Sequence, residues 1–199
     1  IGYDMVPVVA AETVEPAMPA VFAHYLAMVK HADRLLAISE SAAQDFRSFG
    51  ASLQSQGLRG PHVQALPLPV TPHVTQTTDL DDVANSLGIG GRPVVLVVGS
   101  HEPRKNHLVV LEAAGLLWSE GLEFELLFLG GSGWQADDFW AEIERLTREG
   151  RPIQVRSRAT ERELWASYRL ARFTVFPSLL EGYGLPIAES LACGTPVIT

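Results

Sequence analysis

Two acidic residues eight positions apart flank a glycine-rich loop near the end of this chain. Glu181 precedes Gly182 and Gly184, and Glu189 follows Pro186, a favoured first residue of a helix, so that we expect Glu189 in the first helical turn. The unpaired N–H groups at a helix start attract phosphate oxygens, and glycine lets a ligand approach the backbone closely. The pattern predicts a phosphate or diphosphate site whose carboxylates accept hydroxyl groups of a sugar and a ribose. A second interpretation explains the acids equally well: Glu189 complements the helix dipole and Glu181 is solvated.

A second candidate segment, GSHEPRKN, directly follows the β-branched run Val94–Val98. The run predicts a buried strand, and ligands of parallel sheets bind beyond the carboxyl ends of the strands. The adjacent cations Arg104 and Lys105 could neutralise a diphosphate there. Lys105 is one of two lysines against 13 arginines, which argues against routine surface decoration. His101 and His107 flank the pair and could line the cleft, but we expect them to be exposed loop residues.

Composition narrows the class of protein. The 199 residues carry a formal net charge of −8, which argues against a nucleic-acid partner, and 47% are apolar, enough for a substantial core. The single cysteine, Cys193, excludes an intrachain disulfide framework and a multi-cysteine zinc site. Asp79 and Asp81 repeat the Asp-x-Asp spacing of some metal sites, but acids are also common where a helix opens, and we expect no metal there.

Strands alternate with helices through residues 92–199, which predicts a parallel sheet with helices on both faces. The expected strands are 94–98, 124–129, 153–155, 173–176 and 196–198, and the expected helices are 108–118, 137–148, 160–170 and 186–192. The last two helices are expected to start at a Thr160–Glu163 capping box and at Pro186. In the first half we expect a strand over Ile1–Val9, a helix over Val21–His31, a strand over Arg34–Ile38, and a helix that begins at a Ser41–Gln44 capping box. Both ends have the pattern of interior strands, so we expect a partial chain.

The segment PSLLEGYGLPIAESLACGTPVI, with VVLVVGSHEPRKNHLVVLEAA upstream, resembles glycosyltransferase family 4. YDMVPVV and HADRLLAISESAAQDF look like the later part of that family's acceptor-side domain. The family comprises retaining, nucleotide-sugar-dependent enzymes with the α/β GT-B fold, which has two Rossmann-like domains with parallel sheets. The resemblance implies a partial piece of both domains: 1–70 from the acceptor-side domain, 71–91 as a linker with a short helix, and 92–199 as the donor-binding domain, truncated at its end.

The resemblance also implies roles for individual residues. Three would be catalytic: Glu181 would bind donor-sugar hydroxyls and support charge at the anomeric carbon, while Arg104 and Lys105 would stabilise the departing diphosphate. The implied donor-binding residues are Gly99, Ser100, Gly182, Tyr183, Gly184, Leu185 and Glu189, the last on the ribose. The sequence departs from the family pattern twice: Ser100 stands where many members have arginine, and Tyr3-Asp4 stands where a histidine-aspartate pair is common.

By the same resemblance, the reaction would be hexosyl transfer without a metal ion or resident cofactor. The EPRKN form resembles mannosyltransferases of surface-polysaccharide assembly, which favours GDP-mannose over a UDP-sugar as donor. The acceptor would be a saccharide or lipid-linked glycan, met in the cytoplasm or peripherally at the inner membrane face. Two other functions stay open: a sugar-nucleotide epimerase of similar fold, and a nucleotide-binding module without turnover.

Overall fold

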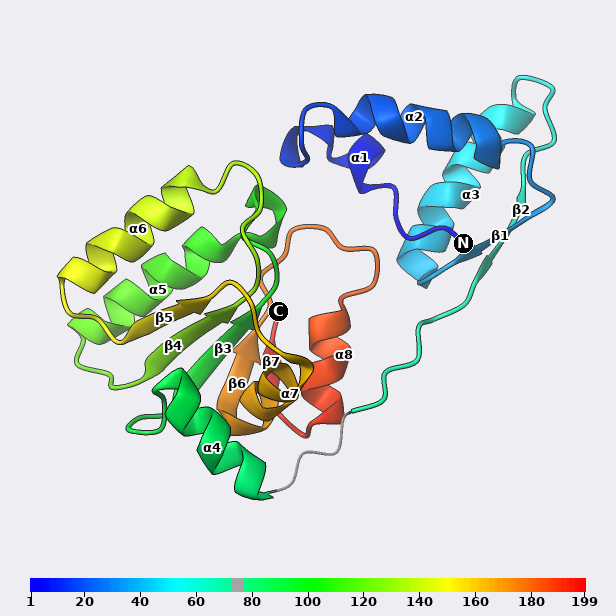
Figure 1. The fold of residues 1–199 in the computed structure, drawn as a ribbon. Coiled ribbons are helices and arrows are strands. Elements are labelled where there is room, and N and C mark those ends of the chain that lie inside the picture. The colour runs from blue at the N-terminus through cyan, green and yellow to red at the C-terminus, as the bar shows by residue number, and fades with distance from the viewer. Residues whose placement is uncertain (73–76) are drawn as a thin grey trace. The chain divides into compact units, whose positions relative to one another are not determined.

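The chain forms two compact units (Figure 1). The computed structural model describes residues 1–72 and 77–199. The first unit comprises Ile1–Pro69 together with Leu180–Gly184, and the second comprises Val70–Leu179 together with Leu185–Thr199. Each unit contains a parallel sheet flanked by helices, which confirms the expected α/β class with parallel sheets.

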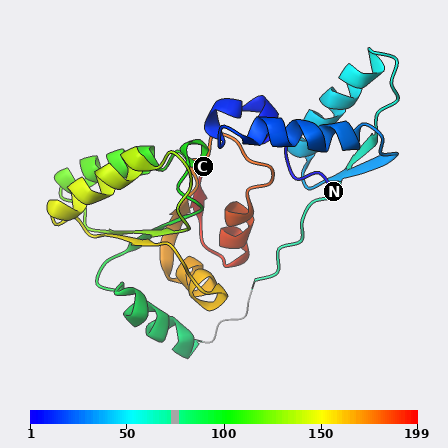
Figure 2. The same cartoon turned by 45° about the horizontal axis from the view of Figure 1, so that its top comes forward.

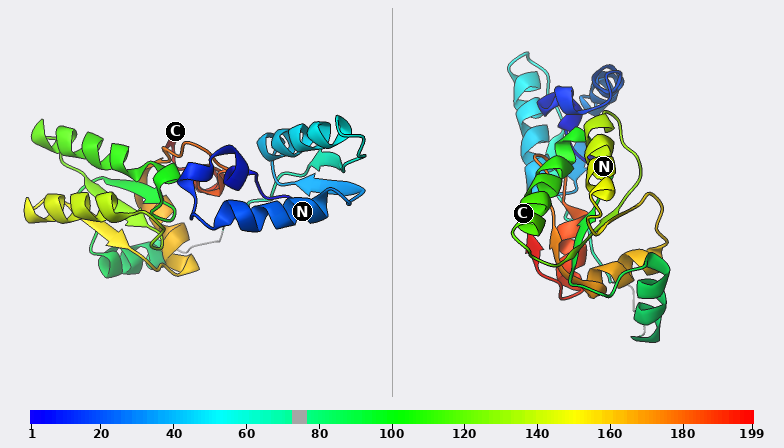
Figure 3. Two further views of the ribbon diagram at one scale, coloured as in Figure 1. Left: turned by 90° about the horizontal axis from the view of Figure 1, so that it is seen from above. Right: turned by 90° about the vertical axis from the view of Figure 1, so that its left-hand side faces the viewer.

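The first unit is built on two parallel strands, β1 (Arg34–Ala37) and β2 (His62–Ala65). Helix α3 (Glu40–Gln54) connects them and packs along both (Figure 3). The unit's apolar core takes side chains from the strands, from α3 and from α2 (Met18–Val29), and Phe46 on α3 is fully buried in it. The remaining elements are the short helices α1 (Val6–Val9) and η1 (Ala11–Thr13).

Two expectations for this unit are wrong. Ile1–Val9 is not a strand: only Gly2 bridges to β1, and the chain then turns into α1 because Asp4 Oδ1 accepts a hydrogen bond from the Val6 N–H and a proline lies in the first turn. The N-cap of α3 is Ser39 rather than Ser41. The Ser39 hydroxyl accepts from the Ala42 N–H at 2.9 Å, directly after the chain leaves β1.

The second unit contains a five-stranded parallel sheet in the order β5-β4-β3-β6-β7. Its strands are β3 (Val94–Val98), β4 (Glu125–Leu129), β5 (Ile153–Arg156), β6 (Ala171–Val175) and β7 (Val197–Ile198). Its helices are α4 (Thr77–Leu87), α5 (His107–Ser119), α6 (Asp137–Arg148), α7 (Glu161–Leu170) and α8 (Leu185–Ala192), with the short η2 (Pro103–Lys105). All five expected strands and all four expected helices of 92–199 are present, with ends that differ by at most two residues.

Alternate side chains of the central strands feed two separate apolar clusters. Leu96 and Leu127 pack with α4 and α7 on one face of the sheet, whereas Val97 and Phe128 pack with α5 and α6 on the other. Figure 2 shows these helix pairs on opposite sides of the sheet. Successive side chains of a strand point to opposite faces of the sheet, and helices cover both faces here. Every residue of β3 therefore faces an apolar cluster, which explains its unbroken apolar sequence.

The region 71–91, where a linker with a short helix was expected, contains helix α4. Helix α4 buries Val83 and Leu87 in the core of the second unit, against α7. The assignment of 1–70 to an acceptor side and 92–199 to a donor side stays a prediction. The Asp79 side chain, part of the Asp-x-Asp pattern, lies outside the described residues. None of the helices in the described ranges is long and apolar enough to cross a membrane.

The capping box that opens α7 gives the first testable prediction. Thr160 Oγ1 accepts from the Glu163 N–H at 3.2 Å, and Glu163 Oε2 accepts from the Thr160 N–H at 2.7 Å, as expected from the sequence. Thr160→Ala is expected to lower the free energy of unfolding by about 1 kcal/mol, measured by urea denaturation, because the Glu163 N–H at the helix start loses its partner. Thr160→Ser keeps the acceptor and is expected to retain most of the stability; an equal loss in both variants would contradict this account.

Candidate functional site

The strand order of the second unit reverses between β3 and β6. From β3 the chain moves outward through β4 to β5, and it then returns to β6 and continues to β7 on the other side. Such a switch point leaves a crevice at the carboxyl ends of the two central strands, where open parallel sheets bind ligands. Gly99 and Ser100 follow β3, and Phe176 follows β6, so these residues form the two sides of the switch point.

The Lys105 side chain lies at this switch point. It is only 8% exposed, its Nζ is 5.3 Å from the centre of the Phe176 ring, and its Cε passes beside Gly99, where an added Cβ would lie 3.5 Å away. Gly99 has a φ of +146°, a conformation that side-chain-bearing residues rarely adopt. Glycine is therefore required here by the backbone turn after β3, and the lysine side chain passes in ordinary contact distance of it. The ammonium over the ring is a cation–π contact between the two strand ends.

Arg104 is oriented by a carboxylate that the sequence analysis missed. Glu102 is 6% exposed, and its Oε1 accepts from Arg104 Nη2 at 3.0 Å and from Ser100 Oγ at 2.7 Å. Its Oε2 is buried without a hydrogen-bond partner. The Glu-Pro-Arg spacing was the available signal, since an acid two residues before an arginine at a tight helical turn can fold back onto it. Glu102 fixes the guanidinium of Arg104 beside Ser100.

Glu189 is held by a buried tyrosine. It lies in the second turn of α8, not in the first as expected, because the helix begins at Leu185. Its Oε2 accepts a hydrogen bond from the hydroxyl of Tyr168, on α7, at 2.7 Å. Burial, followed by the bond to Glu189, raises the pKa of Tyr168 above its ordinary value, so the phenol stays a donor at neutral pH. Tyr168 was not a sequence candidate: in isolation it looks like one more apolar residue of an amphipathic helix.

The glycine loop that carries Glu181 belongs to the first unit. The Ser39 hydroxyl, at the start of α3, donates a hydrogen bond to the Gly182 carbonyl. The Tyr183 hydroxyl donates to the Leu68 carbonyl at 2.8 Å, and its ring packs against the core of that unit. An added Cβ at Gly182 would lie 2.9 Å from the Tyr3 carbonyl oxygen, closer than side chains tolerate, so only glycine fits. These contacts fix the backbone on the C-terminal side of Glu181.

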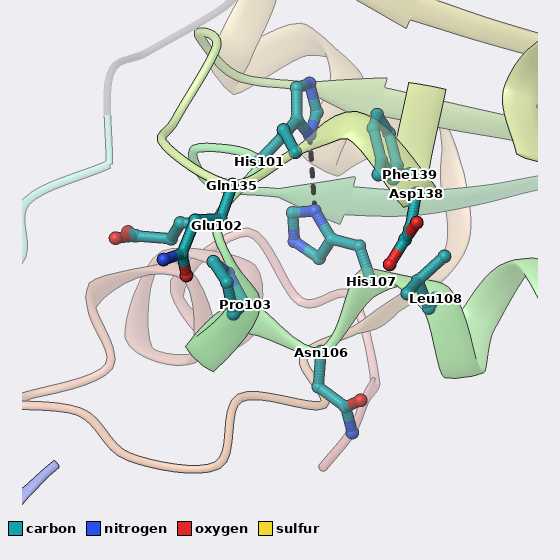
Figure 4. A pocket seen from close by; sticks show the side chains of 10 residues that line it. His101, Glu102, Pro103, Asn106, His107, Leu108, Gln135, Asp138 and Phe139 are labelled. Atoms are coloured by element: carbon teal, nitrogen blue, oxygen red, sulfur yellow. Dashed lines mark hydrogen bonds between the residues drawn. The ribbon is translucent and has the colours of Figure 1, made fainter. Parts of the chain in front are cut away.

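The two histidines of the EPRKN segment are buried, contrary to expectation. His101 is 1% and His107 5% exposed, their Nδ1 atoms are 3.2 Å apart, and the His101 ring stacks on Phe139 at 4.3 Å (Figure 4). Burial, with the nearby charges of His101 and Lys105, lowers the pKa of His107 to about 3. Burial also lowers the pKa of His101. The two histidines line a cavity of about 160 Å³ between the starts of α5 and α6. Pro103 of the η2 turn also lines this cavity.

The ten predicted site residues fall into two groups. The second unit holds Gly99, Ser100, Arg104, Lys105, Leu185 and Glu189, and the first holds Glu181, Gly182, Tyr183 and Gly184. Leu179, just before the loop, donates from its N–H to the Arg104 carbonyl at 2.8 Å, which ties the strand exit after β6 to the η2 turn. Within the described ranges, no group of three His, Cys, Asp or Glu side chains is arranged to hold a metal ion.

Comparison with known proteins identifies a family for most of the second unit. A family described as "Glycosyl transferases group 1" matches residues 81–199. The O-antigen chain mannosyltransferase B of Escherichia coli is 41% identical over 104 residues, which are 52% of this chain and 27% of that protein. The serotype-specific mannosyltransferase WbdA of Escherichia coli is 28% identical over 182 residues, 86% of this chain and 22% of that protein.

Solved structures show the same fold at low sequence identity. Anabaena HepE in complex with UDP and glucose superposes with a TM-score of 0.68 at 19% identity, over 92% of this chain and 48% of HepE. WaaG, a glycosyltransferase involved in lipopolysaccharide biosynthesis, also gives a TM-score of 0.68, at 18% identity, over 92% of this chain and 50% of WaaG. The chain therefore spans about half of these structures and about a quarter of the curated mannosyltransferases.

The buried His107 makes stability depend on pH. Its pKa is about 3 in the folded chain against 6.5 ordinarily, so below pH 6.5 the unfolded chain binds a proton that the folded chain does not. The free energy of unfolding is therefore expected to fall by about 1.4 kcal/mol per pH unit as the pH drops from 6 to 4. Urea denaturation at each pH measures this, and His107→Leu should flatten the slope. The exposed His62→Gln is the control; an equal flattening there would contradict the assignment.

The loop contact at Gly182 gives a third prediction. Gly182→Ala pushes the Tyr3 carbonyl away and breaks the bond from Ser39, so the amides of 180–184 are expected to exchange hydrogen about tenfold faster. The control is Gly115→Ala within α5, where the added methyl group lies 3.9 Å from its nearest neighbour, Leu146 Cδ2. Unchanged protection of the loop in the Gly182 variant would contradict the anchoring described here.

Proposed function

The chain belongs to the group 1 glycosyl transferases, and from this premise we propose that it acts in the transfer of a mannosyl group from GDP-mannose to a saccharide or lipid-linked glycan, with retention of anomeric configuration. The observation that carries the proposal is the placement of Arg104 and Lys105 at the switch point of the parallel sheet. A ligand with concentrated negative charge fits that position, and the diphosphate of a nucleotide sugar has this charge.

The basic pair is suited to stabilising a leaving group. Glycosyl transfer breaks the bond between the anomeric carbon and the diphosphate, so negative charge grows on the departing oxygen. Arg104 is held in one orientation by Glu102, and Lys105 is held between Gly99 and the Phe176 ring, so neither has to be ordered during the reaction. In our proposal these two cations and the first N–H groups of α8 supply the charge stabilisation that a metal ion supplies in other transferases.

The two acids take different parts in this mechanism. Glu181 binds hydroxyl groups of the donor sugar and supports the positive charge that develops on its ring. Glu189 accepts hydrogen bonds from the ribose through Oε1, while Oε2 receives the hydroxyl of Tyr168. With no second carboxylate assigned as a covalent nucleophile, we propose attack of the acceptor hydroxyl on the same face as the leaving group. The departing phosphate oxygen takes the acceptor's proton.

Two relatives favour mannose as the transferred sugar. The proteins matched in Escherichia coli are both described as mannosyltransferases, one of them acting on the O-antigen chain. We therefore propose a place in surface-polysaccharide synthesis, in the cytoplasm or peripherally at the inner membrane face. HepE was solved with UDP and glucose, so a UDP-sugar is the donor against which GDP-mannose has to be tested.

Calorimetric titration with GDP, UDP and ADP, each with and without magnesium, tests the donor site. We expect GDP to bind without magnesium, and Lys105→Ala to weaken its binding about tenfold or more through loss of a charge-assisted contact to phosphate. The matched control is Lys30→Ala, the other lysine of the chain, in the first unit just after α2. Equal effects of the two substitutions would contradict the assignment of Lys105.

Mannosyl transfer from GDP-mannose tests the catalytic assignment. Glu181→Gln is expected to bind GDP as the unaltered protein does and to lose at least about a hundredfold in kcat, because its carboxylate acts on the sugar and not on the nucleotide. Free GDP released in step with transfer supports a transferase. Interconversion of sugars without GDP release would favour the epimerase, and binding without either reaction would favour the non-catalytic module.

A further inference from the structure

The side chain of Tyr168 occupies a position that apolar packing alone does not explain. It is fully buried between α7 and the sheet, and it is the largest fully buried side chain among the described residues. A buried hydroxyl needs a hydrogen-bond partner to offset its lost hydration. The partner is a single atom, Glu189 Oε2, at 2.7 Å. The Tyr168 ring lies in the apolar core, and its hydroxyl donates to one oxygen of the Glu189 carboxylate on α8.

A chain of buried polar contacts fixes both ends of that bond. Thr195 Oγ1 donates to the Tyr168 carbonyl at 2.6 Å, and Ser190 Oγ donates to the Thr195 carbonyl at 3.0 Å. Ser190 also shares a hydrogen bond of 2.7 Å with Thr174 on β6. Because Ser190 is the neighbour of Glu189 on α8, these contacts fix the positions of α7, β6 and α8 relative to one another. The tyrosine hydroxyl therefore has a fixed distance to the carboxylate.

The bond from Tyr168 also fixes what the carboxylate can recognise. A carboxylate accepts hydrogen bonds and cannot donate one. The Tyr168 hydroxyl occupies Oε2 and holds the group in one orientation, and the remaining lone pairs are suited to two neighbouring hydroxyl groups. A vicinal diol is that pair, and the ribose of a nucleotide carries one.

We infer that Tyr168 is a positioning residue that holds the Glu189 carboxylate against the ribose diol, and that through it the site selects ribonucleotides over nucleotides without ribose hydroxyls. This inference rests on the proposed function, which assigns Glu189 to the ribose. To that function it adds Tyr168, which does not touch the ligand, and a selectivity for ribose-bearing nucleotides that depends on the Tyr168 hydroxyl. The ring of Tyr168 contributes to the core, whereas its oxygen contributes to recognition.

A cycle that combines one protein change with one ligand change tests the inference. The probes are GDP and 2′,3′-dideoxy-GDP, or the corresponding pair for UDP or ADP if that is the nucleotide the protein binds, and affinities are measured calorimetrically. Tyr168→Phe keeps the ring in the core and removes only the hydroxyl. We expect it to weaken the binding of GDP about tenfold, which is the typical contribution of a hydrogen bond to a charged group. The affinity for the dideoxy nucleotide is expected to change by less than about twofold.

The matched control is Thr195→Val, which removes a bond of the same buried network without touching Glu189. It is expected to lower stability and to leave the ratio of the two affinities unchanged. Equal weakening of both nucleotides by Tyr168→Phe would show a structural role only and overturn the inference, as would no effect on either. Failure of the unaltered protein to bind any of the three ribonucleotides would overturn the proposed function itself, and the inference with it.

Discussion

The burial of cationic groups at the end of a parallel strand is the constraint on which the site depends. An ammonium or guanidinium loses several kcal/mol of hydration when it is buried, and that loss has to be offset locally. Here Arg104 meets the Glu102 carboxylate and Lys105 meets the Phe176 ring. Both positively charged groups are thus held in place at the strand end, in a chain whose overall charge is −8.

The acidic pair of the glycine loop is divided between the two compact units. Glu181 lies on a segment that Ser39 and Leu68 anchor to the first unit, whereas Glu189 lies on a helix locked by Tyr168 and Ser190 into the second. Only Gly182, Tyr183, Gly184 and four helical residues separate them in sequence.

The sequence predicted the second unit well because its local signals agree with its tertiary structure. Val94–Val98 is apolar on both faces since helices cover both faces, and Thr160 and Glu163 cap α7 through contacts three residues apart. The first unit was harder. Ser41 and Gln44 have the spacing of a capping box, but Ser39 is the N-cap of α3. Ser39 follows β1 in an extended conformation, and its hydroxyl also donates a hydrogen bond to the Gly182 carbonyl. That contact spans 143 residues, and no local pattern encodes it.

The candidate site follows the same division. Arg104 and Lys105 were candidates because charges beside a predicted strand end are visible in the sequence. Glu102 and Tyr168 were not, because only the fold creates their contacts with Arg104 and Glu189. Positioning residues of this kind share their types and spacing with ordinary surface acids and core aromatics. The buried histidines show the converse, since a polar type in a loop predicts exposure and the aromatic packing of Phe128 and Phe139 overrides it.

The departure at Ser100 is explained by the same carboxylate. Ser100 Oγ and Arg104 Nη2 both donate to Glu102 Oε1, so the guanidinium of Arg104 reaches the neighbourhood of residue 100 although it starts four residues later. An arginine at position 100 would add a second guanidinium to that spot, and the small serine leaves the space to Arg104. Our proposal that Arg104 supplies the charge expected after the strand-end glycine rests on this shared carboxylate, because Glu102 determines where the guanidinium lies.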